Sequence, residues 1–433
     1  MPLLFHTGPV PGRCVNVVLR VLAVVVALWL PAARGQLVYD TEYPQIGYAK
    51  TPPADAYSKL MNRLAASGGK LAFDAEGHGY LDGLLQALGI DPSSQALIFS
   101  KTSLKQRYVA PALPRSLFFT DDVYVTFVPG TRSLEVAAMD PLQGPVFFDV
   151  SQDPKADKPY KQETDRCLRC HDTYSMTGGG VPRFLLSSVI AGPTGDLVSH
   201  ELSDITDQAT PIEQRFGGWY VTGMSGKQIH RGNFIVKDIN ELKQQPWVGK
   251  INQASLDGFV DLKAYPRKTS DIVALMVLQH QTEVQNRLVR LNYESRKLLA
   301  GKPQPADAVL QELIKPVLQV MFFADEPKYA DALSGNSGYQ QWFEQRGPKT
   351  ADGKSLRQFD LKTRTFRYRL SYLIYSDAIA ALAAPVKTLL FRDIQAVLGG
   401  DAKLLDGFVL PADERDTIKA ILQATRPDVL AAK

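Results

Sequence analysis

The feature that most constrains this chain is one short run that holds both of its cysteines after residue 14. Cys167 and Cys170 stand in Cys167-Leu168-Arg169-Cys170-His171. Two thiols at this spacing can reach the two vinyl groups of a porphyrin, and the adjacent histidine can then bind the iron. In an exported chain, a Cys-x-x-Cys-His run is typical of a haem c attachment site. The sequence therefore predicts one covalent haem c, attached at Cys167 and Cys170 and ligated by His171.

An apolar segment near the N-terminus supports this interpretation. Arg20 precedes an apolar run over residues 21–30, and the small residues Ala33 and Gly35 follow it. These are the parts of a secretory signal peptide, whereas a membrane-spanning helix needs about 18 apolar residues. We therefore expect residues 1–35 to be a signal peptide and the mature chain to be periplasmic or secreted. The alternative is an uncleaved N-terminal anchor, and we expect no other membrane contact.

Two other uses of the cysteine pair are disfavoured. A redox-active pair is typical of a thioredoxin-like βαβ unit, and the glycines at 178–180 with Pro182 are a poor start for its helix. A structural zinc ion needs four ligands, and no second cysteine or histidine pair lies near the motif.

Composition gives little indication of a partner. The chain has 433 residues, a formal net charge of +4 and 22% charged residues. No lysine- or arginine-rich run is dense enough to indicate a polyanion. We therefore expect no nucleic-acid binding, and contact instead with a redox partner protein or a small-molecule substrate.

The pattern of apolar residues predicts an α+β fold. Turn residues separate β-prone runs at 96–99, 123–128, 134–138, 146–150, 184–190 and 219–222, and helical spacing occurs at 57–66 and 81–88. From Ser270 the pattern becomes helical, with segments at 270–299, 306–323, 369–383, 386–398 and 412–423. We expect a β-rich haem-binding region over 36–265 and a helical C-terminal region over 266–433.

The second axial position of the iron decides whether a haem protein transfers electrons or reacts with a bound molecule. His230 lies in a glycine-rich loop, and His280 lies on the apolar face of a helical segment. Both are candidate ligands beside His171. An exposed loop histidine and a hydrogen-bonded core histidine are the simpler interpretations. Met224 is a third candidate, because small cytochrome domains often use a methionine downstream of the motif.

Three arginines flank the motif and the glycine-rich loop, namely Arg183, Arg215 and Arg231. Haem carries two carboxylate side chains that need cationic or hydrogen-bonding partners, and one of these arginines could supply such a partner. Ordinary surface charge is the simpler interpretation for each.

The chain resembles a group of secreted bacterial cytochrome c domain-containing proteins with a single Cys-x-x-Cys-His motif near the middle. The likeness covers most of the mature chain. It is carried by residues 98–103 (IFSKTS), 121–125 (DDVYV), 165–171 (DRCLRCH), 217–223 (GGWYVTG), 270–276 (SDIVALM) and 372–376 (YLIYS).

This resemblance implies a haem-binding electron carrier or redox protein. His171, His230 and His280 match histidines of the group's pattern. The chain departs from that pattern at Gln208, Ser225 and Gln285, where further histidines are expected. Any metal-binding role of those positions in the group is therefore in doubt for this chain.

Three hypotheses for function follow. The first is an exported monohaem c-type cytochrome that acts in electron transfer, with both axial positions filled by the protein. The second is a periplasmic haem enzyme, peroxidase- or oxidase-like, with an open distal site; the length of the chain favours it, because electron transfer alone needs only about 100 residues. The third is a haem-based sensor. We favour electron transfer.

Overall fold

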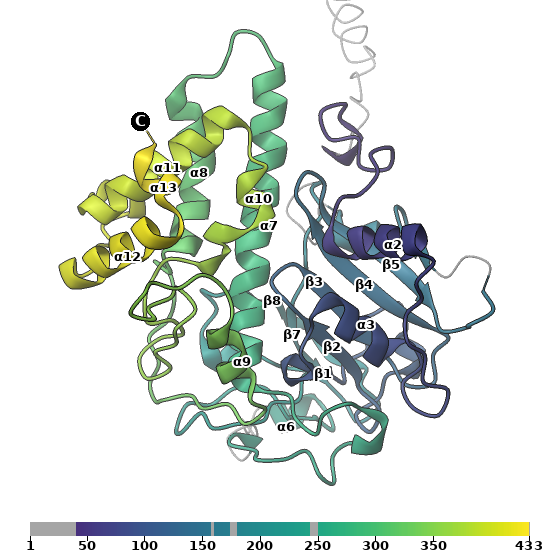
Figure 1. Cartoon of the computed structure of the whole chain (residues 1–433). Coiled ribbons are helices and arrows are strands. Elements are labelled where there is room, and N and C mark those ends of the chain that lie inside the picture. Colours follow the sequence, from purple (N-terminus) through teal and green to yellow (C-terminus); the bar gives the residue numbers. More distant parts are fainter. Residues whose placement is uncertain (1–39, 157–159, 174–179, 243–249, 433) are drawn as a thin grey trace, which may run out of the picture. The chain divides into compact units, whose positions relative to one another are not determined.

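The computed structural model describes residues 40–156, 160–173, 180–242 and 250–432 (Figure 1). The predicted signal peptide over residues 1–35, with Cys14, lies outside the described residues. Among the helices that the structure describes, none is long and apolar enough to cross a membrane.

An antiparallel sheet of six strands forms the first half of the fold, and its strand order follows the chain. The strands are β1 (Ala96–Ile98), β2 (Arg115–Phe119), β3 (Val123–Phe127), β4 (Ser133–Asp140), β5 (Gly144–Ser151) and β6 (Tyr160–Gln162). Short turns join most neighbours, so residues close in sequence pair directly, as expected for a meander.

Alternate residues of each strand point to opposite faces of this sheet. Tyr124 pairs with Ala137, which pairs with Phe147, so these three residues share one face. We call it the motif face, because Phe147 contacts the histidine of the motif. Val136 and Phe148 point to the opposite face. Both faces are covered, which explains why most strand residues are buried.

Two helices cover the face opposite the motif face (Figure 1). They are α2 (Ala56–Ser67), which contacts β4, and α3 (Leu81–Leu88), which contacts β3. Asp55 caps α2 by accepting hydrogen bonds from the main-chain N–H groups of Tyr57 and Ser58. The Tyr57 ring then packs 4.7 Å from the Phe148 ring, measured between centroids.

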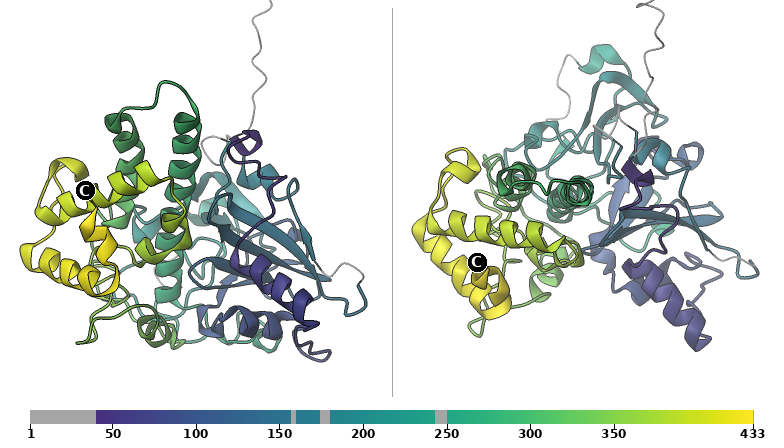
Figure 2. Two further views of the ribbon diagram at one scale, coloured as in Figure 1. Left: turned by 45° about the horizontal axis from the view of Figure 1, so that its top comes forward. Right: turned by 90° about the horizontal axis from the view of Figure 1, so that it is seen from above.

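A long helix, α7 (Ile272–Ala300), lies on the side of the motif face and contacts β5. Asp271 caps the N-terminus of α7, because its side chain accepts a 2.8 Å hydrogen bond from the Val273 N–H group. The two views of Figure 2 show α7 and α8 (Asp307–Met321) side by side. The same core cluster holds Val125 of the sheet and Leu288 of α7, so both predicted regions contribute to one core.

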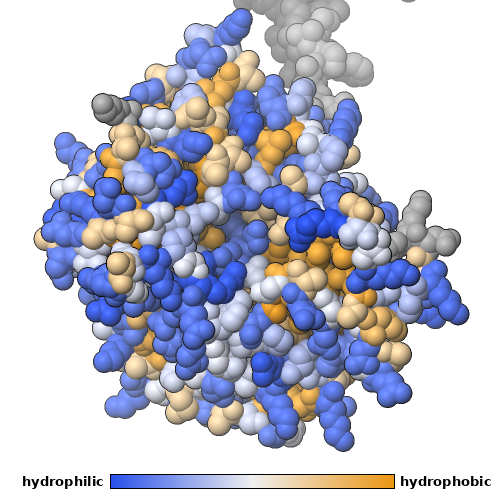
Figure 3. Space-filling view, viewed as in Figure 1, coloured by the Kyte–Doolittle hydropathy of each residue, from blue (hydrophilic) through white to orange (hydrophobic). Residues whose placement is uncertain are grey.

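Shorter elements complete the fold. A two-stranded sheet pairs β7 (Ser187–Ala191) with β8 (Leu197–Ile205). The other α-helices of the described residues are α4 (Leu168–His171), α6 (Ile239–Leu242), α9 (Tyr339–Gln345), α10 (Asp377–Ala380), α11 (Ala384–Gly399), α12 (Ala412–Thr425) and α13 (Pro427–Ala431). Single 3₁₀ turns occur at Asp40–Glu42, Pro92–Ser94, Gln106–Tyr108, Ile212–Gln214, Leu262–Ala264, Tyr372–Tyr375 and Lys403–Leu405. On the face seen in Figure 3, hydrophilic residues cover most of the helical side, and hydrophobic residues gather on the sheet side.

The α+β prediction is confirmed, with a helical C-terminal region after the sheets. Two local predictions were wrong. The segment 369–383 is a 3₁₀ turn followed by α10, because the side chains of Ser371 and Ser376 each cap a new turn. The segment 219–222 forms only isolated bridges, since Tyr220 N–H bonds to Leu97 and Thr222 N–H to Ser270.

Candidate functional site

The cysteine motif forms a single helical turn against the motif face. Cys167 has helical backbone angles and precedes α4, and the His171 N–H group donates to the Cys167 main-chain oxygen at 3.1 Å. Residues three apart in a helical turn lie on the same side. Both cysteines are free thiols, Cys170 exposed and Cys167 half-buried. The turn therefore presents two reduced thiols on one side, directly before a histidine.

The imidazole of His171 is held by one main-chain group. Its Nδ1 atom lies 2.6 Å from the Arg183 carbonyl oxygen, and the Arg183 N–H group donates to the His171 carbonyl oxygen at 2.9 Å. A carbonyl oxygen only accepts, so Nδ1 carries the proton and Nε2 keeps its lone pair. Metal-binding histidines in proteins show the same arrangement. Burial lowers the pKa of His171, which keeps the ring neutral at neutral pH.

The ring of His171 is also fixed by its packing. It lies 4.6 Å from the ring of Phe147, measured between centroids, at an angle of 45°. Because Phe147 belongs to β5 in the middle of a regular ladder, the sheet sets the position of the imidazole plane. The histidine is thus oriented by one carbonyl group and one aromatic ring.

A second pair of hydrogen bonds joins Phe184, the residue after Arg183, to α7. The side-chain amide of Asn286 accepts from the Phe184 N–H group at 2.8 Å and donates to the Phe184 carbonyl oxygen at 2.9 Å. Arg183 and Phe184 therefore form a clamp between His171 and the long helix. The sequence analysis did not single out Asn286; a polar residue among the apolar residues of a helix was the available signal.

The charges around Cys167 disfavour a redox-active cysteine pair. Burial, with the carboxylates of Glu135 and Glu163 nearby, raises the pKa of the Cys167 thiol to about 12. Reactive cysteines in disulfide oxidoreductases need the opposite shift, because the thiolate is the nucleophile. The structure therefore keeps Cys167 as a neutral thiol.

His230 is buried in the loop after the 219–222 segment. Its Nδ1 atom accepts a hydrogen bond from the Gly232 N–H group at 3.1 Å, so in the neutral ring the proton lies on Nε2. This tautomer is the reverse of that of His171. Burial lowers the pKa of His230 to about 4. To bind iron through Nε2, His230 would have to move its proton and lose the bond from Gly232.

His280 lies on α7 in an aromatic pocket. Its Nδ1 atom is 2.7 Å from Gln208 Oε1, and its Nε2 atom is 2.8 Å from Ser371 Oγ. The ring stacks on Phe323 at 4.1 Å between centroids. Both nitrogens are thus hydrogen-bonded, and the side chain of Gln208 supplies one of the two partners. Burial lowers the pKa of His280 to about 3.

Acid should destabilise the protein through His280. His280 takes up a proton near pH 6.5 in the unfolded chain and only near pH 3 in the folded one. Its contribution to the unfolding free energy is therefore fully present above pH 6.5 and is lost as the pH falls toward 3. At pH 5 the loss of unfolding free energy amounts to about 2 kcal/mol. We expect His280→Gln to reduce by that amount the difference in unfolding free energy between pH 7 and pH 5, measured with urea. His78→Gln, at a partly exposed position, is the control. Equal acid sensitivity of wild type and His280→Gln would contradict this prediction.

The other candidate residues lie in different surroundings. Met224 is 49% exposed, and its main chain pairs with Ser334. Arg231 approaches Asp204 at 3.8 Å, and Arg215 is completely buried. Within the part of the chain that the structure describes, no three histidine, cysteine, aspartate or glutamate side chains gather into a metal-binding group. The structure thus brings together Cys167, Cys170 and His171, and describes no shared metal-binding group that includes His230 or His280.

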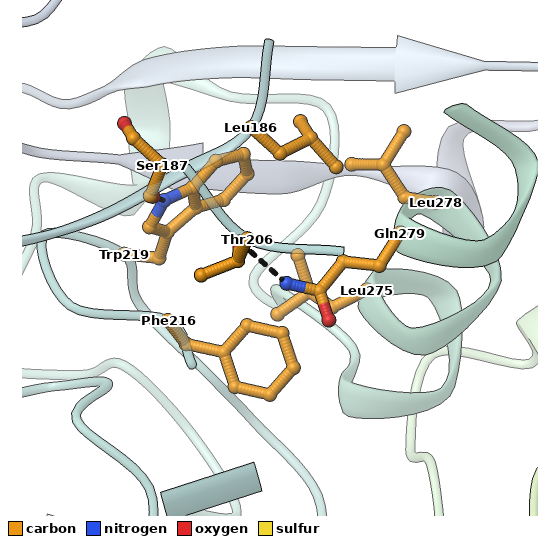
Figure 4. A pocket seen from close by; sticks show the side chains of 8 residues that line it. All are labelled: Leu186, Ser187, Thr206, Phe216, Trp219, Leu275, Leu278 and Gln279. Atoms are coloured by element: carbon orange, nitrogen blue, oxygen red, sulfur yellow. Dashed lines mark hydrogen bonds between the residues drawn. The ribbon is translucent and has the colours of Figure 1, made fainter. Parts of the chain in front are cut away.

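Two cavities lie between α7 and the segment that follows the motif. The larger, of about 290 Å³, includes Arg183 and Arg287 in its walls. The smaller, of about 10 Å³, holds roughly one water molecule and is drawn in Figure 4. Gln279 reaches across the smaller cavity and donates to Thr206 Oγ1 at 3.0 Å (Figure 4). Leu186 and Thr206 line both cavities, which are therefore neighbours.

No family model, curated protein or solved structure matches this chain. The resemblance to secreted cytochrome c domain-containing proteins stays a prediction. The chemistry of the site rests on its own residues, above all on the arrangement of His171.

Proposed function

We propose that this chain is an exported monohaem c-type cytochrome that acts in electron transfer. Cys167 and Cys170 would carry the haem through two thioether bonds, and His171 would bind its iron. The observation that carries the proposal is the 2.6 Å contact between His171 Nδ1 and the Arg183 carbonyl oxygen. It leaves Nε2 with the lone pair that an iron ligand needs.

The residues present fit such a group. Thioether formation consumes two reduced thiols, and both cysteines are free and on one side of the same turn. The haem would supply a reversible one-electron change. The protein's own contribution is to keep the imidazole neutral, to fix its plane against Phe147 and to hold it in one tautomer.

The hydrogen bonds of the other histidines favour a second candidate function, a haem enzyme with an open distal site. His230 accepts a main-chain N–H group, and both nitrogens of His280 are bonded. Either histidine would have to break a hydrogen bond before it could bind the iron beside His171. An open position would allow a small molecule to bind the iron, as in peroxidases and oxidases.

Absorption spectra of the protein exported from a host that matures haem c test both ideas. We expect a c-type spectrum, with reduced-state bands that carbon monoxide leaves unchanged, because a firmly bound protein ligand excludes it. A spectrum that shifts under carbon monoxide would overturn the electron-transfer assignment in favour of the enzyme. Protein without haem would overturn the cytochrome proposal itself.

A further inference from the structure

One peptide group joins the proposed iron ligand to α7. The carbonyl oxygen of Arg183, which lies 2.6 Å from His171 Nδ1, and the N–H group of Phe184 belong to the same peptide unit. This unit is trans, so its two polar groups point in opposite directions. His171 therefore lies on one side of the unit. Asn286 of α7, whose Oδ1 atom accepts the Phe184 N–H bond at 2.8 Å, lies on the other.

The side-chain amide of Asn286 has only one favourable orientation at this position. Its Nδ2 atom donates to the Phe184 carbonyl oxygen at 2.9 Å, while its Oδ1 atom accepts from the Phe184 N–H group. Turning the amide over would bring its two donor hydrogens against the N–H group and its oxygen against the carbonyl oxygen, so both bonds would be lost. Asn286 thus presents an acceptor to this peptide unit in a fixed direction.

Contacts with the sheet hold α7, and with it Asn286, in place. The Tyr124 hydroxyl group of β3 donates to Gln285 Oε1 at 2.5 Å, and Gln281 Nε2 donates to the same hydroxyl at 2.7 Å. The Tyr124 ring also packs 4.6 Å from the Phe184 ring, measured between centroids. One tyrosine therefore contacts both partners of the Asn286 bonds, namely the helix and the segment after the motif.

We propose that Asn286 is a positioning residue that strengthens the hydrogen bond from His171 Nδ1 to the Arg183 carbonyl group and thereby tunes the imidazole as an iron ligand. An acceptor on the N–H group of a peptide unit shifts electron density onto its carbonyl oxygen, and linked hydrogen bonds strengthen each other by about 10–30%. A stronger acceptor at Nδ1 makes the imidazole a more basic ligand. The effect on the iron rests on the proposed function, whereas the effect on the imidazole does not.

The tautomer of His171 in the full chain produced without haem tests the first step. Nitrogen-15 chemical shifts of the two ring nitrogens at pH 8, above the ordinary pKa of histidine, give the ratio of the Nδ1–H to the Nε2–H form. We expect the Nδ1–H form in the wild type. In Asn286→Leu the ratio should be about threefold lower, because leucine fills similar space but accepts no hydrogen bond. The Nδ1 proton resonance should also move upfield as its hydrogen bond weakens.

Redox titrations of the haem-loaded protein test the second step. A less basic imidazole stabilises oxidised iron less, so Asn286→Leu should raise the reduction potential. The oxidised-to-reduced ratio at a fixed applied potential should fall about threefold, which equals about 28 mV for one electron. Entry of water through a loosened fold would stabilise the more highly charged oxidised state and lower the potential instead. The sign therefore separates positioning from packing.

Two further variants make the test specific. Asn292→Leu removes an asparagine of equal exposure from the same helix, whose amide donates to the Leu142 main-chain oxygen at 2.7 Å. It should lower the melting temperature about as much as Asn286→Leu does, and leave the tautomer ratio and the potential unchanged. Asn286→Asp keeps an acceptor oxygen for the Phe184 N–H group and should retain the Nδ1–H form.

The outcomes separate this inference from the proposed function. Wild-type protein without haem after export from a maturing host would refute the cytochrome proposal, and the tautomer ratio of Asn286→Leu would still decide the role of Asn286. Equal ring-nitrogen shifts in the wild type and Asn286→Leu would overturn the inference, and so would an equal loss of the Nδ1–H form in Asn286→Asp. A lowered melting temperature of Asn286→Leu at an unchanged tautomer ratio and potential would show that Asn286 only joins Phe184 to the helix, and would also overturn it.

Discussion

We expect alanine at both Cys167 and Cys170 to abolish the covalent haem attachment proposed above and to leave the fold of the chain in place. These are the only two thiols after residue 14, so no other side chain of that part of the chain can form the thioethers. Cys170 is exposed and Cys167 only half-buried, so truncation of both removes little buried surface. We expect a complete loss of the haem mass increment in denaturing mass spectrometry, with the circular dichroism spectrum of a folded α+β protein retained.

Controls for this experiment lie within the same chain. Cys14→Ala changes the remaining cysteine, which falls within the predicted signal peptide, and should leave attachment unchanged. The single variants Cys167→Ala and Cys170→Ala each keep one thiol and should retain haem through one bond at reduced yield. A double variant that still carries covalent haem would refute the assignment of these residues.

Features encoded within a few residues could be predicted from the sequence. The arrangement of the cysteine motif is one, because thiols three residues apart in a helical turn lie on the same side, whereas its haem chemistry stays a prediction. The start of α7 is another, since Ser270 and Asp271 precede a long apolar pattern and Asp271 does cap the helix. Leu81–Leu88 was predicted as a helix with the bounds that the structure shows. In each case the physical cause is local.

Features that depend on distant contacts could not be predicted. The Nδ1 partner of His171 is a main-chain carbonyl group twelve residues away, and no side-chain pattern indicates a carbonyl acceptor. Asn286 closes its clamp on Phe184 across 102 residues of sequence. Strand β2 was missed because Arg115–Phe119 lacks the polar alternation of a half-exposed strand: both faces of the sheet are covered.

For the candidate iron ligands too, the local setting could be predicted from the sequence, whereas the contacts with distant residues could not. Sequence alone placed His230 in a glycine-rich loop and His280 on the apolar face of a helical segment, but their hydrogen-bond partners follow from the folded chain. His280 lies between Gln208 and Ser371, which come from segments on either side of it in sequence. A histidine that satisfies both nitrogens in the core and one that binds iron have the same sequence signature. Their tautomers and partners distinguish them, and these are properties of tertiary structure.

Arg215→Met will destabilise the protein by about 3 kcal/mol at neutral pH. The side chain is 1% exposed, and burial lowers its pKa from the ordinary value. Its guanidinium group donates to the Thr210 and Gln208 main-chain oxygens, both at 2.6 Å, and to Gln279 Oε1 at 2.8 Å. Methionine fills similar space but donates nothing, so three acceptors lose their partner inside the core. The variant also no longer has to bury a charged guanidinium group, and this gain offsets part of the destabilisation.

Urea unfolding of the two proteins measures the difference, with Arg392→Met as the control. Arg392 is 51% exposed and 3.9 Å from Asp307, so its replacement should change the unfolding free energy by less than about 0.5 kcal/mol. Because Gln208 also bonds to His280, Arg215→Met should loosen the His280 pocket as well. The variant's amides along 276–282 should then exchange faster with deuterium. If Arg215→Met unfolds with the wild-type free energy, the hydrogen bonds of the guanidinium group only balance the cost of burying it, and Arg215 does not stabilise the fold.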